Sequence, residues 1–184
     1  GGQTICHVAN TTFAHGSTVG ITGPNGSGKS TLLRVLAGIE TAFAGECVVD
    51  AAVKDRVFVH QSPYLFSGTV LSNVEYGLKA RSTSRSIRQE QAVLWLERFG
   101  VAHLARRSVE SLSGGEKRRT ALARACVLQP KLLLLDEPLA DLDPAGIDSV
   151  AQSLNKLDAS TILITSPSPL PPDLTQATIS LRQE

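Results

Sequence analysis

The fold is decided by the stretch Gly23-Pro24-Asn25-Gly26-Ser27-Gly28-Lys29-Ser30, which matches the phosphate-loop pattern G-x-x-x-x-G-K-[ST]. The β-branched run Thr18–Ile21 predicts a strand before it, and Ser30–Leu36 has the periodicity of a helix after it. Glycines let backbone N–H groups turn toward phosphate oxygens, and a helix N-terminus favours anions. The sequence therefore predicts a nucleotide-phosphate site in an α/β protein.

The roles of individual loop residues follow from this pattern. Lys29 is expected to reach the β- and γ-phosphates of ATP, and Ser30 to offer its hydroxyl to Mg²⁺. Thr31 completes the expected ATP-binding segment, 23–31. The alternative interpretation is a glycine-rich turn between a strand and a helix that binds no ligand.

A second candidate site follows an apolar strand. The run Leu132–Leu135 is continued by Asp136 and Glu137, and strand alternation directs successive side chains to opposite sides. Asp136 is expected to enter the Mg²⁺ shell, and Glu137 to orient the attacking water or accept its proton. A solvated turn after a core strand is the alternative, because acidic residues are common where loops begin.

The rest of the chain alternates strands with helices, which is typical of a parallel sheet with helices around it. Extended segments at Ile5–Phe13 and Glu46–Asp50 predict a small antiparallel sheet beside this core. A helix is predicted over Ile87–Phe99, with the side chains of Ile87, Gln91, Leu94 and Trp95 on one side. Further strands are predicted at Val57–Val59, Ile162–Thr165 and Thr178–Leu181.

These elements predict a single domain over residues 1–184. Its core, with the β subdomain, takes 1–61 and 112–184, and the mostly helical stretch 62–111 reads as an inserted helical subdomain. The chain begins at Gly1 and contains no Met, which indicates a processed or trimmed end or an incomplete domain. Because it ends soon after the last predicted strand, no C-terminal regulatory domain is expected.

Composition excludes several classes of protein. The chain is 42% hydrophobic and 19% charged, which is too apolar for a disordered chain. A net charge of +1 argues against a nucleic-acid partner. No apolar run approaches the length of a membrane span, so any membrane role is expected to come through a partner. Three widely spaced cysteines predict buried small side chains and fit a reducing cytoplasm: Cys6, Cys47 and Cys126.

The segment Leu112-Ser113-Gly114-Gly115-Glu116 is where the sequence resembles the ATP-binding cassette (ABC) ATPases, because LSGGE is the signature of that family. Gln61 resembles the family's Q-loop glutamine, and Ala140-Asp141-Leu142-Asp143 resembles its D-loop. The resemblance covers nearly the whole chain, and it implies a P-loop NTPase core with a parallel sheet, a small antiparallel β subdomain and an inserted helical subdomain carrying the signature.

The signature also has a physical interpretation of its own. Ser113, Gly114 and Gly115 precede a helix-forming run from Glu116 to Leu128, so a hydroxyl and two amides are expected at the positive end of a helix dipole. The resemblance implies that two cassettes pair head to tail, with the phosphate loop of one facing the signature of the other across ATP. An ordinary capped loop is the alternative for this segment alone.

The resemblance implies a division of labour within such a dimer. Ser30, Gln61 and Asp136 would hold Mg²⁺, and Lys29 would hold the phosphates. Glu137 would act on the attacking water, and Ser113 and Gly115 of the partner would complete the shell of the γ-phosphate. The implied catalytic residues are Glu137, Lys29, Gln61 and Ser166, and the implied D-loop residues are Asp141 and Asp143.

The stretch Ser62–Leu78 is similar to the surface of importer-type cassettes that takes up a coupling helix of the membrane subunit. It contains the apolar triplet Tyr64-Leu65-Phe66, and exposed apolar clusters often mark interfaces. The alternative is that this triplet fills the junction between the helical insert and the sheet.

Two positions depart from the family pattern. Where the family has a histidine after the strand Ile162–Thr165, this chain has Ser166 followed by Pro167. Serine is shorter than imidazole and carries no charge, so slow turnover is expected. The position of the family's adenine-stacking aromatic falls just before Gly1, so base stacking is expected to be lost. The histidines read as surface or strand residues: His7, His15, His60 and His103.

The sequence therefore predicts an ATPase, the ATP-binding subunit of an ABC transporter, peripheral on the cytoplasmic face of the membrane. It would hydrolyse MgATP in a homodimer or heterodimer of cassettes to drive transport, with import indicated by Ser62–Leu78. One alternative is a regulatory or assembly module whose hydrolysis is impaired by Ser166, and another is the ATPase of an exporter. A cassette of the DNA-repair type is disfavoured because no coiled-coil insert separates phosphate loop and signature.

Overall fold

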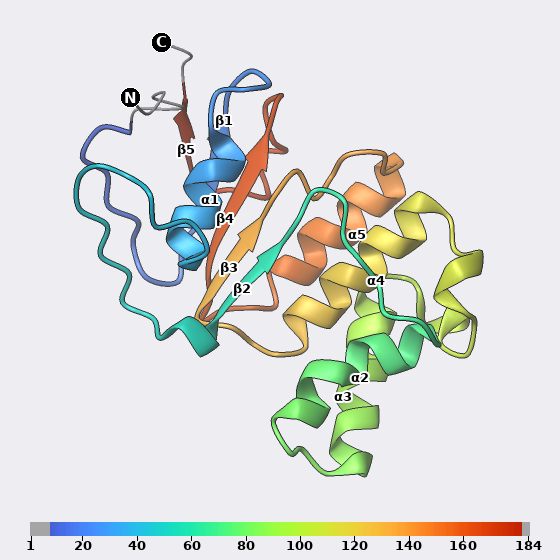
Figure 1. Ribbon diagram of the computed structural model, residues 1–184. Coiled ribbons are helices and arrows are strands. Elements are labelled where there is room, and N and C mark those ends of the chain that lie inside the picture. Colours follow the sequence, from blue (N-terminus) through green and yellow to red (C-terminus); the bar gives the residue numbers. More distant parts are fainter. Residues whose placement is uncertain (1–7, 182–184) are drawn as a thin grey trace. The chain divides into compact units, whose positions relative to one another are not determined.

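The computed structural model describes residues 8–181, and its contacts divide the chain into two compact units (Figure 1). The first unit holds the described residues up to Gln61, Pro130–Pro138, and the described residues from Asp158 onward. The second unit holds Ser62–Gln129 and Leu139–Leu157. Within the described part of the chain, no helix has both the length and the apolar character that crossing a membrane requires.

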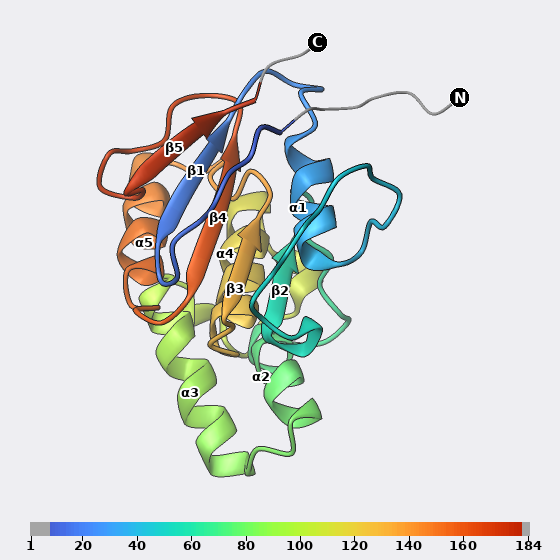
Figure 2. The ribbon, with the colours of Figure 1, turned by 90° about the vertical axis from the view of Figure 1, so that its left-hand side faces the viewer.

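The first unit is built on a parallel sheet with the strand order β2-β3-β4-β1-β5 (Figure 2). Because the strands are parallel, their carboxyl ends meet at one edge, and the register pairs Val59 with Leu135 and Leu135 with Ile164. The residues that follow these positions therefore lie close together. The strands are β1 Thr18–Thr22, β2 Arg56–Val59, β3 Leu132–Leu135, β4 Thr161–Ser166 and β5 Ala177–Ser180.

Helix α1, Lys29–Ala37, packs on one face of this sheet. The apolar side chains on its inner side, Leu33 and Leu36, are buried against alternate residues of β1 and β3. Gly38 ends the helix in the left-handed conformation, φ 77°, which glycine adopts without strain. The strand β1, the phosphate loop and α1 thus have the order that the sequence predicts. The cluster comprises Val19, Ile21, Leu33, Leu36, Ala37, Leu132, Leu134, Leu163 and Leu181.

The predicted antiparallel sheet is not formed in the described residues. Neither 8–13 nor Glu46–Asp50 is a strand, and the remainder of the first segment lies outside the described residues. Val8, Phe13 and Val49 instead pack as partly buried side chains against the core cluster of the first unit. Their apolar character therefore reflects packing on the sheet. A separate pair of short strands has little stability of its own.

The second unit is helical. Its helices are α2 Val70–Ala80, α3 Arg85–Arg98, α4 Gly114–Cys126 and α5 Pro144–Leu154, with short 3₁₀ turns at Ala102–Leu104 and Val109–Ser111. The apolar residues predicted to share one side of α3 differ in exposure: Trp95 is buried, while Ile87 and Leu94 are about half exposed. The buried side is set by Ala92, Trp95 and Leu96, whose i, i+3, i+4 spacing places them on one face.

The second unit contains more of the chain than the predicted helical insert, 62–111. It joins α4 and α5 to α2 and α3, because α4 packs on both α2 and α3 and α5 packs on α3 and α4. Cys126 of α4 is fully buried, and burial raises the pKa of its thiol. Cys47 is partly buried, while Cys6 and His7 lie outside the described residues.

Candidate active site

The phosphate loop between β1 and α1 has the backbone of an anion-binding turn. Gly26 and Gly28 have φ values of 82° and 85°, and Gly28 caps α1 without a side chain. At Gly23, with φ 155°, an added Cβ atom would lie 2.5 Å from the carbonyl oxygen of Leu181. The loop therefore has room only for glycine at this position, and its glycines allow backbone N–H groups to point inward at the helix start.

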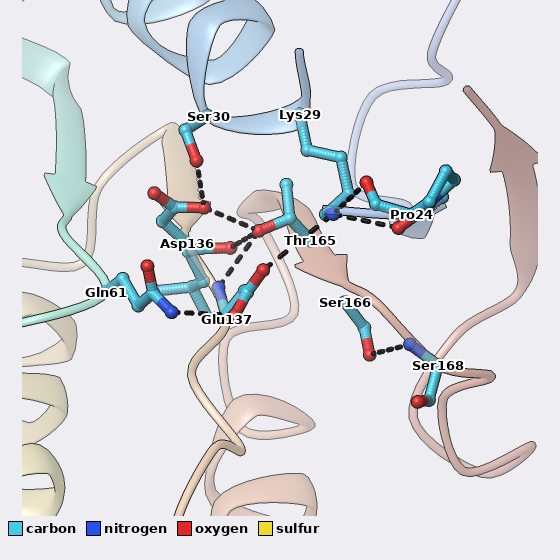
Figure 3. Close-up of polar contacts among 11 residues, drawn as sticks. Pro24, Lys29, Ser30, Gln61, Asp136, Glu137, Thr165, Ser166 and Ser168 are labelled. Carbon is cyan, nitrogen blue, oxygen red and sulfur yellow. Dashed lines mark hydrogen bonds and ion pairs between the residues drawn. The ribbon is translucent and has the colours of Figure 1, made fainter. Parts of the chain in front are cut away.

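Lys29 is buried at the start of α1, with 4% of its side chain exposed. Its ammonium group donates to the carbonyl oxygens of Gly23 and Pro24 at 2.8 and 3.1 Å, and it lies 3.8 Å from Glu137 Oε1 (Figure 3). A buried ammonium must be paired or hydrogen-bonded. The loop thus fixes the lysine charge at its centre, facing the end of β3.

Asp136 follows β3 and has 3% of its surface exposed. Its Oδ1 accepts a hydrogen bond from the Ser30 hydroxyl at 2.9 Å and another from the Thr165 hydroxyl at 2.8 Å (Figure 3). The carboxylate therefore connects the first turn of α1 with the end of β4. Ser30 and Asp136, which the sequence predicts as two ligands of Mg²⁺, therefore lie within hydrogen-bonding distance of each other.

Glu137 has a left-handed backbone, φ 47°, which is uncommon outside glycine. Its backbone N–H donates to Thr165 Oγ1 at 2.9 Å, and its Oε2 accepts from Gln61 Nε2 at 2.8 Å (Figure 3). Gln61 follows β2, so the carboxyl ends of β2, β3 and β4 all contribute side chains to the network, two of them from β3. Strain of this kind concentrates at functional sites, where surrounding contacts hold it in place.

Thr165 is a residue of this network that the sequence analysis missed. It is fully buried at the end of β4, and its hydroxyl donates to the Asp136 carboxylate while accepting from the Glu137 backbone. One side chain therefore orients both acidic residues. The sequence carries a usable signal: Thr165 is a polar residue at the end of an apolar run, beside the position already singled out.

Ser166 lies outside this network. Its hydroxyl accepts a hydrogen bond from the Ser168 backbone at 3.2 Å, which closes a local turn (Figure 3). Thr165 and Ser166 alternate along β4, so their side chains point to opposite sides of the strand.

The signature and D-loop residues lie in the second unit. Ser113 caps α4 by accepting from the Glu116 backbone at 3.3 Å, while its own N–H donates to Glu116 Oε2 at 2.7 Å. This reciprocal capping box lowers the pKa of Glu116, chiefly through the backbone N–H of Ser113. Gly114 faces open space, since an added Cβ atom there would meet nothing within 4 Å. The start of α4 is thus ordered and accessible.

The residues of the first unit fit a nucleoside triphosphate with Mg²⁺. Among the described residues, the buried Ser27 hydroxyl in the phosphate loop has no hydrogen-bond partner, whereas buried polar atoms are normally satisfied. Ser30 and Asp136 present a hydroxyl and a carboxylate oxygen to each other, and Mg²⁺ prefers such hard oxygen ligands.

This arrangement defines a class of protein, the P-loop NTPases: a lysine and a serine at a helix start, with two carboxylates at the end of a buried strand of the same sheet. Comparison with known proteins identifies the family within that class. The ABC transporter family matches residues 6–140. The chain belongs to the ABC transporter family, and it has the fold of an ABC ATPase cassette.

Its curated relatives include ATP-binding proteins of uptake systems. The chain is 37% identical over 172 residues to the tungstate uptake system ATP-binding protein TupC of Peptoclostridium acidaminophilum, which covers 89% of this chain and 80% of that protein. It is 39% identical over 166 residues to the Fe(3+) ions import ATP-binding protein FbpC of Streptomyces avermitilis. That match covers 85% of this chain and 48% of FbpC, so the chain spans about half the length of this relative.

Solved structures show the same fold. The bacterial ABC transporter cassette MJ0796, solved as a dimer, superposes with a TM-score of 0.85 at 28% identity, covering 94% of this chain and 84% of that one. The same cassette has also been solved as a dimer in a post-hydrolysis state with ADP and Pi, with a TM-score of 0.79, 29% identity, and coverage of 86% and 78%.

Proposed function

We propose that this chain is the ATP-hydrolysing subunit of an ABC importer, working as a head-to-tail dimer on a membrane subunit at the cytoplasmic face. The observation that supports ATP hydrolysis is the network of side chains beside the phosphate loop, in which Lys29 lies near Glu137 and Asp136 contacts Ser30 and Thr165. The domain organisation remains part of this proposal: one domain, with a core of 1–61 and 112–184 and a helical subdomain at 62–111.

In this proposal each residue of the network has one task. The loop amides and Lys29 bind the phosphates, while Ser30, Gln61 and Asp136 would hold Mg²⁺. Bound Mg²⁺ would neutralise charge on the transferred phosphoryl group. Glu137 orients the attacking water and accepts its proton, because its carboxylate is held by Gln61 and its backbone N–H by the hydroxyl of Thr165.

The dimer would complete the site with the partner's signature. Ser113 and Gly115 lie at the N-terminal end of α4, where the helix dipole favours an anion. The dimeric form of the similar cassette MJ0796 supports this assembly. The uptake and import systems named for TupC and FbpC support import. The dimer could join two copies of this chain or this chain and a related cassette.

The proposed docking surface for the membrane subunit is an exposed aromatic cluster, which we define as Tyr64, Phe66 and Tyr76. These side chains are 71%, 39% and 55% exposed, and the ring centroids lie 5.7 Å apart for Tyr64 and Phe66 and 4.4 Å for Phe66 and Tyr76. Asn73 holds both backbone groups of Phe66, at 2.8 Å each, and Arg124 lies over the Phe66 ring. The cluster is therefore exposed and ordered, as interface anchors are.

The double substitution Tyr64→Ser and Tyr76→Ser is expected to abolish co-purification with the proposed membrane subunit, because two exposed aromatic anchors are lost. MgATP affinity should be unchanged, since the phosphate loop lies in the other unit. Val48→Ser is the matched control, as Val48 is an apolar side chain that is 81% exposed in the first unit. Retained co-purification of the double variant would show that the membrane subunit docks elsewhere.

Ser166 favours one rival, a regulatory module in which ATP controls assembly but is hardly hydrolysed. Because position 166 is a serine, the end of β4 offers no imidazole. The serine hydroxyl itself is engaged in the turn with Ser168. Losing one positioned donor at a developing charge typically lowers the rate by about 10²–10³-fold. We therefore expect a slow basal ATPase with normal MgATP affinity.

A histidine at position 166 followed by an aspartate at position 167 would resemble the family's His-Asp pair, and introducing both is expected to distinguish the ATPase from the regulatory module. Ser166→His alone gains little, because Pro167 fixes its own φ and restricts the backbone of residue 166. The double variant Ser166→His with Pro167→Asp should raise single-turnover hydrolysis at saturating MgATP by at least about tenfold. If the parent already hydrolyses at a rate that the double variant cannot improve, another group supplies the histidine's function.

A further inference from the structure

Arg118 in the second turn of α4 contacts the D-loop, Ala140-Asp141-Leu142-Asp143. One guanidinium nitrogen, Nη1, donates to the Ala140 carbonyl, and Nη2 lies 3.5 Å from Asp141 Oδ2. The Arg118 side chain is 11% exposed, whereas that of Asp141 is 85% exposed. The carbonyl contact is therefore the sheltered one, and the ion pair lies at the surface.

The D-loop is fixed to the same face of α4 at a second point. Gly115 lies one turn before Arg118, and an added Cβ atom there would be 3.5 Å from Leu142 Cδ2 and 3.8 Å from the Asp141 carbonyl oxygen. Residues three apart in a helix share a face. Gly115 of the signature and Arg118 therefore lie on the same side of α4, and the D-loop contacts that side.

The D-loop is held by contacts at two points. Asp141 has a left-handed backbone, φ 60°, which is uncommon outside glycine, although aspartate adopts it more readily than most residues. At the other end, Asp143 caps α5 by accepting from the Gly146 backbone at 2.9 Å. The segment is therefore held by α5 at one end and by Arg118 in its middle.

We propose that Arg118 is a positioning residue that ties the D-loop to the signature helix, so that the two elements meet a second cassette as one preformed surface. This rests on the head-to-tail dimer proposed above. Arginine suits the task because its planar fork can serve a carbonyl and a carboxylate at once, whereas a lysine ammonium is a single point charge. Preformed surfaces bind more tightly because less ordering is required on association.

The test uses the Glu137→Gln background, in which an ATP-bound dimer is expected to accumulate. Arg118→Ala should weaken MgATP-dependent dimerisation by at least about tenfold, and Arg118→Lys should restore it only in part. Asp141→Asn should weaken it by no more than about threefold, because an exposed ion pair contributes little. Lys117→Ala, a neighbouring charge on the same helix, is the matched control. Dimerisation is measured by size-exclusion chromatography with light scattering.

A second readout separates positioning from a general structural defect. Arg118→Ala should bind MgATP as a monomer with unchanged affinity, measured by isothermal titration. In a mixture with Lys29→Ala, still in the Glu137→Gln background, one composite site has an intact phosphate loop from one chain and an intact signature face from the other. The mixture should therefore form MgATP-dependent dimers at a protein concentration at which neither variant does so alone.

Two results would overturn the role of Arg118: dimerisation of Arg118→Ala equal to that of the Lys117→Ala control, or failure of the mixture to dimerise. If Arg118→Ala does not fold, Arg118→Met keeps the aliphatic stem and replaces it in both experiments. Failure of the Glu137→Gln parent itself to dimerise would contradict the proposed assembly instead, so the two failures are distinguishable.

Discussion

Glu137→Gln is expected to lower MgATP turnover by about 10²–10⁴-fold, the usual contribution of a positioned general base. The amide is nearly isosteric with the carboxylate, and its oxygen can still accept the hydrogen bond from Gln61, but it cannot take up the proton of the attacking water. Nucleotide affinity should be retained, because the phosphate loop and Asp136 are unaltered. Turnover is measured as phosphate release under steady-state conditions.

The same variant is expected to accumulate an ATP-bound dimer, visible by size-exclusion chromatography. Glu46→Gln is a suitable control, since Glu46 is exposed in the same unit and has the same change in charge. A Glu137→Gln protein that hydrolyses as fast as the control would show that Glu137 does not activate the water. The carboxylate would then serve only to hold Gln61 and Lys29.

Lys29→Ala is expected to weaken MgATP binding by about 10²-fold or more, so that no binding is detected at micromolar nucleotide. The substitution removes a buried cation, and a hydrogen bond to a charged group contributes up to about 3 kcal/mol. It also leaves the Gly23 and Pro24 carbonyls without their ammonium donor. Affinity is measured by titration with a fluorescent ATP analogue.

The control for this substitution is Lys131→Ala, an exposed lysine in the same unit. Circular dichroism of both variants checks that the fold is retained. Equal titration curves for Lys29→Ala and the parent would contradict the assignment of the phosphate loop.

Local sequence predicted the elements that carry the first site. The phosphate loop, its strand and its helix occur where the pattern placed them, because glycine conformations and a helix start are decided within a few residues. The strand Leu132–Leu135 was predicted to the residue, since a fully buried parallel strand is apolar at every position. The positions of Asp136 and Glu137 could be predicted as well, because these residues come directly after the end of that strand.

Other features depended on contacts between distant segments. Thr165 meets Asp136 only because the register pairs Leu135 with Ile164, and no local pattern contains that pairing. The sequence placed Leu94 and Trp95 on one side of α3 without showing which of them is covered, because both are apolar and only packing decides it. The antiparallel sheet was predicted from extended segments that pack on the core without pairing.

The hydroxyl of Thr165 limits which amino acids that position can accept. It must donate one hydrogen bond and accept another while fully buried, and only a short hydroxyl side chain does both in that volume. Valine would keep the shape, remove one of the two hydrogen bonds to the Asp136 carboxylate, and take the acceptor away from the Glu137 backbone N–H. Serine would keep the chemistry and lose the stiffness of a β-branched side chain. Thr165 lies outside every recognised motif, yet its position accepts only threonine or serine. This restriction is comparable to the one on the glycines of the phosphate loop.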